Sequence, residues 1–286
     1  MAAQTNAAPG QRAFAFLRTN HRPQKPRSRG VTEIRGPYYT AMGPRYLADV
    51  LETMGEHVDI LKFAGGSFTL MPERALREIV DTAHQHDVLV STGGFVEYVL
   101  TQGADAVDRY VEECARLGFD IIEVSSGFIT IPQDDFLRVV ERVQRAGLKA
   151  KPEVGIQFGA GGATSPEELE QAGVRDVSAA IELAKRALER GAYMIMIESE
   201  GITEEVREWR TDVVFKIAAE LGIENVMFEA ADPPVFQWYV QTFGPEVNLF
   251  VDHSQIVQLE CLRRGIWGTA NLWGRVLTYQ PDSQPH

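Results

Sequence analysis

The chain has 286 residues and a formal net charge of -12, from 28 basic and 40 acidic residues. Its hydrophobic content of 44% is ordinary for a globular protein, and one large α/β domain can reach this length. An acidic chain lacks the clustered positive surface that neutralises phosphates, which argues against a nucleic-acid-binding protein. The sequence has no apolar run of about 18 residues, so we expect no membrane span.

The basic residues are concentrated at the start of the chain. Residues 1–36 hold seven basic residues and one acid, Glu33. Residues 1–30 contain prolines and glycines with few apolar side chains, which predicts a disordered basic tail; an organelle transit peptide is the alternative. The two cysteines, Cys114 and Cys261, are too few for a disulfide framework and fit a reducing cytoplasm.

From residue 31 onward, short apolar runs alternate with longer segments of helical periodicity. The short runs predict strands and the longer segments predict helices. In chain order we expect a strand at 31–35, a helix at 44–54, a strand at 58–63, a helix at 72–83, a strand at 88–91, a helix at 104–117, a strand at 121–125 and a helix at 133–146. Then follow a strand at 149–156, a helix at 177–190, a strand at 193–198, a helix at 204–221, a strand at 225–230, a helix at 233–243, a strand at 247–251 and a helix at 254–264.

Eight strand–helix units predict a parallel sheet, and over about 240 residues they fit a single α/β domain with the (β/α)8 TIM-barrel fold. An open doubly wound sheet is the alternative. It usually has a glycine-rich phosphate-binding loop after the first strand, and Gly36-Pro37-Tyr38-Tyr39 is not one. We therefore predict one barrel over residues 31–267, followed by a loosely attached C-terminal extension over residues 268–286.

Carboxylates are unusually frequent where the predicted strands end, which is where barrel enzymes place their chemistry. Four successive strands carry a glutamate near the carboxyl end, namely Glu123, Glu153, Glu198 and Glu229. Such carboxylates repel one another unless a cation offsets them, and carboxylate oxygens are ligands that Mg²⁺ prefers. The alternative is a set of structural ion pairs with Lys62 and Lys151. Because residues two apart share one face of a strand, Lys151 and Glu153 must point the same way.

Other strand-end residues give weaker signals. His253 follows the eighth strand beside Asp252 and is an alternative candidate for the site. Gly93 and Gly94 follow the third strand, and other glycine pairs follow the second and fifth. Glycines in these positions let a backbone approach an anion closely, although each is also compatible with a tight turn. Their shared location favours a small anionic ligand.

Motifs across the predicted barrel resemble those of the phosphosulfolactate synthases. They are KFAGGS (62–67), STGGFVEY (91–98), IEVSSG (122–127), PEVG (152–155), IMIES (195–199), MFEA (227–230), VNL (247–249) and LECLRRG (259–265). The resemblance runs from about residue 31 to residue 270. A closer likeness is to the branch of this superfamily that contains the plant heat-stress-associated 32-kilodalton proteins, through LMPE, AHQHDVLVSTG, YVEECARLGFD, LKAKP and GPEVNLFVDHSQI.

The resemblance implies a lyase that adds sulfite to C3 of phosphoenolpyruvate with Mg²⁺, through an enolate-like intermediate, on the route to coenzyme M. Small anionic substrates are then the partners. Barrels of this size commonly form homo-oligomers, so we expect a homo-oligomer, and the cysteines favour the cytoplasm. The resemblance and the strand-end positions together give three groups of expected site residues. We expect catalysis by Lys62, Lys151 and His253; substrate binding by Gly93, Gly94, Glu97, Ser126, Asn248 and Arg263; and metal binding by Glu123, Glu153, Glu198 and Glu229.

Four positions depart from the synthase pattern. Trp267 stands where the synthases have arginine, and Ala41 or Met42 stands where they have an acidic residue. Gln157 stands where the synthases have lysine, and Glu200 stands where they have arginine. These departures favour an alternative function, a heat-stress-associated protective protein that has lost synthase activity. A related barrel enzyme with a different small anionic substrate is a further alternative.

Overall fold

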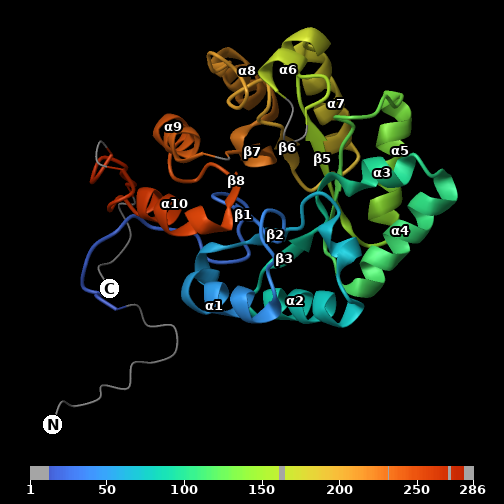
Figure 1. Ribbon diagram of the computed structural model, residues 1–286. Helices are drawn as coiled ribbons and strands as arrows, with labels where there is room; N and C mark the ends of the chain where they lie inside the picture. The colour runs from blue at the N-terminus through green and yellow to red at the C-terminus, as the bar shows by residue number, and fades with distance from the viewer. Residues whose placement is uncertain (1–12, 161–164, 231, 270–271, 280–286) are drawn as a thin grey trace.

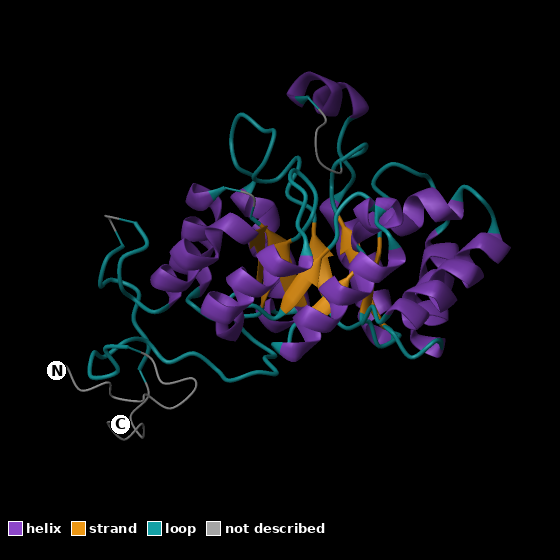
Figure 2. Ribbon diagram, turned by 60° about the horizontal axis from the view of Figure 1, so that its bottom comes forward, coloured by secondary structure: helices purple, strands orange, loops and turns teal. Residues whose placement is uncertain are grey.

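The computed structural model describes residues 13–160, 165–230, 232–269 and 272–279. Its centre is a closed barrel of eight parallel strands in sequential order, surrounded by helices (Figures 1 and 2). The strands are β1 Thr32–Arg35, β2 Ile60–Lys62, β3 Leu89–Ser91, β4 Ile121–Val124, β5 Lys149–Val154, β6 Ile195–Ile197, β7 Val226–Glu229 and β8 Leu249–Asp252. The predicted (β/α)8 barrel is confirmed. The alternative open sheet is excluded, because β1 pairs with β8 from Thr32↔Leu249 to Arg35↔Asp252.

Ten α-helices lie outside the strands in the described part of the chain. They are α1 Pro44–Met54, α2 Glu73–Gln85, α3 Val96–Leu100, α4 Ala104–Leu117, α5 Gln133–Arg145, α6 Pro166–Ala172, α7 Val177–Glu189, α8 Thr211–Leu221, α9 Pro233–Phe243 and α10 Ile256–Arg263. Prolines begin α1 and α9, where a missing N–H is harmless, and Gly118 ends α4 with a φ of 91°. None of these helices is long and apolar enough to cross a membrane.

Three helical features differ from the sequence-based expectation. Helix α8 begins at Thr211 rather than Glu204, because Glu204 accepts a hydrogen bond from the Ser199 hydroxyl (2.6 Å) and forms an isolated bridge with Glu200. The short helices α3 and α6 were not expected. Helix α6 has a local signal for its start, since Ser165 and Glu168 form a reciprocal capping box.

Two layers of side chains fill the barrel, and strand alternation explains both. The lower layer is apolar and includes Ile60, Ile121, Met196, Met227 and Phe250. Residues two positions further along the same strands face the same way. That second residue is charged in all five strands, namely Lys62, Glu123, Glu198, Glu229 and Asp252. The barrel therefore carries a charged layer directly above its apolar interior, toward the carboxyl ends of the strands.

The two chain ends are more ordered than expected. We predicted a disordered tail over residues 1–30, but Arg22 and Arg27 are buried and pair with Glu260 (3.1 Å) and Asp59 (2.9 Å) at the amino-terminal end of the barrel. The C-terminal extension also packs, since Leu272 and Val276 belong to the apolar core. The amino-terminal segment supplies arginines that pair with distant carboxylates, and the C-terminal segment supplies apolar side chains to the core. Residues 1–12, 270–271 and 280–286 lie outside the described residues.

Candidate active site

The principal cavity opens at the carboxyl ends of the strands and measures about 630 Å³. Strands from around the whole barrel contribute to its walls, so it is the position at which barrel enzymes carry out chemistry. Its charged lining consists of Arg35, Lys62 and a series of carboxylates. The carboxylates are Glu97, Glu123, Glu153, Glu198, Glu200, Glu204, Glu205 and Glu229.

A chain of alternating charges forms the floor of this cavity. Lys62 lies 2.8 Å from Glu123 and 3.8 Å from Glu153, measured between Nζ and the carboxylate oxygens. Lys151 pairs with the other oxygen of Glu123 (3.0 Å) and with Glu33. Lys151 and Glu33 are fully buried, so Lys151 lies beneath the cavity rather than at its surface. Lys151 and Glu153 both face the interior, as alternation along β5 predicts.

The two lysines fix the ionisation of Glu123. Burial opposes the charged form of this carboxyl, but Lys62 and Lys151 outweigh burial and lower its pKa to about 2. Burial also opposes the charge on Lys62, and here Glu123 and Glu153 prevail and raise the lysine pKa. Lys62 is therefore a permanent cation at the cavity floor. A group held this firmly in its charged form suits anion binding better than proton transfer.

The carboxyls of Glu153 and Glu198 are in the opposite situation. Burial and the nearby Glu123 carboxylate raise the pKa of Glu153 well above its ordinary value. Burial and the Glu229 carboxylate raise the pKa of Glu198 to about 8. Glu198 also accepts a hydrogen bond from the backbone N–H of Glu200 (3.0 Å). Around Glu153 and Glu198, the site therefore has more carboxyl groups than cations.

Arg35 is a cation of the site that the sequence analysis missed. It is the last residue of β1, and its Nη2 lies 2.9 Å from Glu229. The guanidinium also lies over the rings of Tyr39 and Phe250, each with its centroid 5.2 Å away. Arg35 was counted with the basic tail, although its place at a strand end was a usable signal. Together with Lys62 it gives the cavity two fixed positive charges.

Glu97 has a structural function at the rim of the cavity. Its carboxylate accepts hydrogen bonds from the Ser125 hydroxyl (2.6 Å) and from the backbone N–H groups of Gly127 (3.0 Å), Phe128 (2.8 Å) and Ile129 (3.2 Å). These four donors occupy both of its oxygens. Glu97 therefore holds the loop after β4 in place, and it lines the cavity without being free to bind an anion.

The glycine pair after β3 permits close packing of the barrel rim. Gly93 has a φ of 63°, and a Cβ atom at this position would lie 2.5 Å from the carbonyl oxygen of Phe63. A Cβ atom on Gly94 would lie 2.5 Å from the Ser125 hydroxyl. Gly94 lines the cavity, whereas Gly93 is buried behind it. The position of Gly93 requires glycine for steric reasons, independent of any ligand, and a side chain at Gly94 would force the Ser125 hydroxyl to move.

Three expected site residues lie elsewhere. Asn248 precedes β8 at the amino-terminal end of the barrel, where it accepts from the Val31 N–H (2.9 Å) and donates to the Val226 carbonyl (3.0 Å). Arg263 is fully buried at the same end and donates to the Pro245 carbonyl. His253 follows β8 at the correct end but lines neither this cavity nor its neighbour. Both of its ring nitrogens are occupied, by the Arg35 carbonyl (3.1 Å) and the Tyr46 hydroxyl (2.9 Å).

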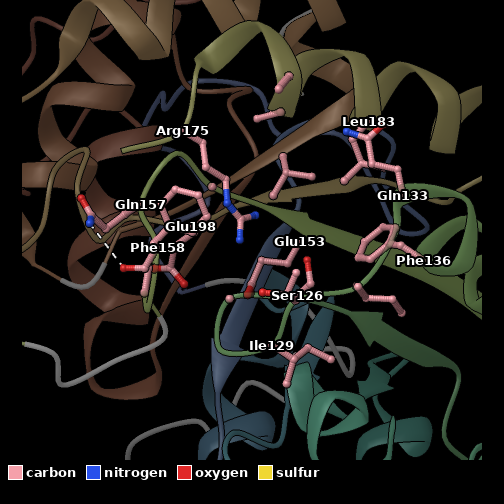
Figure 3. A pocket seen from close by; sticks show the side chains of 18 residues that line it. Ser126, Ile129, Gln133, Phe136, Glu153, Gln157, Phe158, Arg175, Leu183 and Glu198 are labelled. Carbon is pink, nitrogen blue, oxygen red and sulfur yellow. Dashed lines mark hydrogen bonds between the residues drawn. The ribbon is translucent and has the colours of Figure 1, made fainter. Parts of the chain in front are cut away.

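A second, smaller cavity of about 250 Å³ adjoins the first. It lies between the loops that follow β4 and β5 and the starts of α5 and α7, and it is lined by Ser126 and Arg175 (Figure 3). Glu153 and Glu198 line both cavities. We call this smaller space the side cavity. The two acids with raised pKa values thus stand at the junction between the two spaces.

The carboxylate set can be tested against the requirements of Mg²⁺. The described residues contain no group of three or more His, Cys, Asp or Glu side chains that could hold a metal ion, so the expected four-glutamate metal site is not formed. Mg²⁺ is usually held by one or two carboxylates together with substrate oxygens and water, so two suffice. Glu198 and Glu229 fit, because they end neighbouring strands and their mutual repulsion is part of what raises the pKa of Glu198. Glu123 does not fit, since lysines engage both of its oxygens.

Comparison with known proteins agrees with the sequence motifs. Residues 20–269 match the family described as (2R)-phospho-3-sulfolactate synthase (ComA). Protein HEAT-STRESS-ASSOCIATED 32 of Arabidopsis thaliana is 40% identical over 259 residues, which cover 87% of this chain and 91% of the plant protein. The phosphosulfolactate synthase of Methanothermobacter thermautotrophicus is 28% identical over 263 residues, which cover 90% of this chain and 96% of the archaeal protein.

Solved structures share the architecture at low sequence identity. Pyruvate carboxylase T882A of Rhizobium etli superposes with a TM-score of 0.56 and 12% identity, over 81% of this chain and 24% of the carboxylase. Its carboxyl transferase domain, solved with pyruvate, gives 0.55 and 11%, over 79% of this chain and 40% of that chain. At such identity the likeness shows a shared barrel only. The match over residues 20–269 includes every strand and all the glutamates of the site, and the chain belongs to the phosphosulfolactate synthase (ComA) family.

Proposed function

We propose that this protein is a Mg²⁺-dependent lyase that joins sulfite to C3 of phosphoenolpyruvate. The observation that carries the proposal is the charge arrangement of the principal cavity. Two cations, Arg35 and Lys62, line the cavity together with a larger number of carboxyl groups, and the pKa values of Glu153 and Glu198 are raised. Cations suit the phosphate and carboxylate of phosphoenolpyruvate, and the acidic side suits a divalent metal. Membership of the synthase family supports this pairing.

Each group has a definite part in this reaction. Arg35 and Lys62 bind and orient the anionic groups of phosphoenolpyruvate. Glu198 and Glu229 would hold Mg²⁺, which supplies positive charge where an enolate develops. The sulfur lone pair of sulfite forms a bond to C3, and the C2–C3 π electrons move toward the substrate carboxylate. Glu153, whose raised pKa keeps it protonated, then donates a proton to C2.

An activity assay with matched variants tests the proposal. Purified protein is incubated with phosphoenolpyruvate, sulfite and Mg²⁺, and the phosphorus resonances are followed by NMR. We expect a new phosphate ester from the unaltered protein and none from Glu153→Gln or Glu198→Gln, with unchanged circular dichroism. Glu52→Gln, an exposed change on α1, should retain full activity. Absence of product from correctly folded, unaltered protein overturns the proposed reaction.

Protection of other proteins under heat stress is the second candidate function. It is favoured by the higher identity to the plant heat-stress-associated protein, 40% against 28% for the archaeal synthase. The structure adds that Gln157 donates to the backbone carbonyls of Leu169 (2.7 Å) and Gly173 (2.9 Å), so its amide is committed to a structural contact. A client-aggregation assay separates the two functions. Protection that persists in Glu153→Gln, together with no turnover by the unaltered protein, favours the protective function.

The proposal also includes assembly into a homo-oligomer in the cytoplasm. Most oligomeric proteins form closed symmetric assemblies of identical chains, so a dimer is the simplest expectation. Light scattering on the purified protein measures the mass directly. Fractionation of the source cells locates the compartment.

A further inference from the structure

Among the residues that the structure describes, Arg175 is a cation without a counter-ion at the side cavity. Among the described residues, no carboxylate pairs with its guanidinium and no acceptor takes a hydrogen bond from it. Its one described contact is with the ring of Phe158, whose centroid lies 4.4 Å from Cζ. Figure 3 shows the guanidinium extended into the side cavity, toward Glu153 and Ser126. A half-buried guanidinium has five N–H donors, and here they are available to a ligand.

The backbone beneath Arg175 is fixed. Residues 156–158 run antiparallel to residues 173–175, with hydrogen bonds from the Arg175 N–H to the Ile156 carbonyl and from the Phe158 N–H to the Gly173 carbonyl (3.3 Å). Gln157, only 5% exposed, fastens this pair of segments through its side-chain amide. Gln157, which replaces a synthase lysine, thus positions Arg175. Gln157 lacks the positive charge of the synthase lysine after β5, and Arg175, 18 residues further along the chain, supplies a positive charge in its place.

The size of the side cavity limits its ligand. At about 250 Å³ it is much smaller than the principal cavity of about 630 Å³. Among its other polar lining residues, Ser126, Thr130 and Gln133 carry neutral groups that can bond an oxyanion. The lining also includes the carboxyls of Glu153 and Glu198, whose pKa values are raised by burial and by neighbouring carboxylates. A planar guanidinium matches two oxygens of an oxyanion at once. Ser126 was expected to bind substrate, and this is the cavity that it lines.

We propose that Arg175 and the side cavity bind sulfite, separately from phosphoenolpyruvate in the principal cavity. The inference rests on the proposed function for the identity of the anion, whereas the existence of an oxyanion site rests on Arg175 alone. Because Glu153 and Glu198 line both spaces, sulfite in the side cavity lies next to the place where phosphoenolpyruvate would bind. Two anions that repel each other are thereby held by different cations until they react.

Titration calorimetry with Arg175→Gln tests the site without requiring turnover. Sulfite and phosphoenolpyruvate are titrated separately into the unaltered protein in the presence of Mg²⁺. We expect the variant to bind sulfite at least about ten-fold more weakly, the loss of a charge-assisted contact, and phosphoenolpyruvate within about two-fold. The sulfite affinity of Arg175→Lys should lie between those of the unaltered protein and Arg175→Gln. Arg207→Gln removes an 86%-exposed arginine side chain and should change neither affinity.

The possible outcomes separate the site from the reaction. Equal sulfite affinity in the unaltered protein and Arg175→Gln overturns the site, as does a selective loss of phosphoenolpyruvate binding. A clear fall in the melting temperature of Arg175→Gln also overturns it, because that would make the residue structural. Arg175-dependent sulfite binding without turnover supports the site and contradicts the proposed reaction. Turnover with an unchanged KM for sulfite in Arg175→Gln supports the reaction and contradicts the site.

Discussion

Replacing Glu198 with glutamine should change how the stability of the protein depends on pH. Burial and Glu229 raise the pKa of this carboxyl from 4.5 to about 8. Between these values the folded protein keeps a proton that the unfolded chain releases, so stability falls as the pH rises. For one such group the free energy of unfolding decreases by about 3 kcal/mol between about pH 6 and about pH 9. Glutamine has no proton to lose, and it can still accept the hydrogen bond from the Glu200 N–H.

Urea unfolding at the two pH values, in the presence of EDTA, measures this effect. We expect Glu198→Gln to lose less stability than the unaltered protein between about pH 6 and about pH 9, by a difference of about 3 kcal/mol. Glu52→Gln is the matched control and should follow the unaltered protein, because Glu52 is exposed on α1. Comparing the change with pH in each variant cancels the titration of all the other groups. An identical pH dependence in Glu198→Gln and the unaltered protein refutes the reasoning, since the carboxyl would then ionise normally.

Three further substitutions test the structural contacts, each by urea unfolding. Lys151→Met leaves Glu33 buried without its counter-charge and should lower stability by about 3–5 kcal/mol; adding Glu33→Gln should recover most of the loss, and no recovery would contradict the pairing. Arg22→Ala breaks a buried ion pair and should lower stability by about 3 kcal/mol. As a control, Arg74→Ala on the surface of α2 should have no measurable effect. Equal effects of the two substitutions would mean that the amino-terminal segment does not contribute to stability. Glu97→Gln brings an amide NH₂ toward backbone N–H donors and should lower stability by about 1–3 kcal/mol; an unchanged unfolding curve would show that the loop after β4 is held by other contacts.

The barrel could be predicted because its signals are local. Short apolar runs and segments of helical periodicity alternate eight times, and prolines and glycines mark where many helices begin and end. Alternation along a single strand also predicted that Lys151 and Glu153 point the same way, and the structure shows that both face the interior. The four glutamates at strand ends were predicted to meet, and Glu123, Glu153, Glu198 and Glu229 all line the principal cavity.

Contacts between distant segments could not be predicted in this way. The pairing of Arg22 with Glu260 joins residues 238 positions apart, and no local pattern distinguishes Arg22 from a solvated charge. Asn248 was assigned to the site through the family resemblance, although the expected strand at 247–251 already placed it at the amino-terminal end, where the structure has it. Arg175 sits in a segment with no periodicity, and its orientation depends on the pairing of residues 156–158 with 173–175.

Asn20 joins the two ends of the described chain. Its side chain donates to the carbonyls of Arg263 (3.0 Å) and Val276 (2.7 Å) and accepts from the Thr278 N–H (3.1 Å). The first strand likewise has β8 as one of its two neighbours. During translation, residues 20–35 therefore leave the ribosome long before the partners that complete their contacts. The edge of β1 that later pairs with β8 is unpaired at this stage. It has to remain protected, by chaperones or by transient contacts, until residues 249–278 have been synthesised.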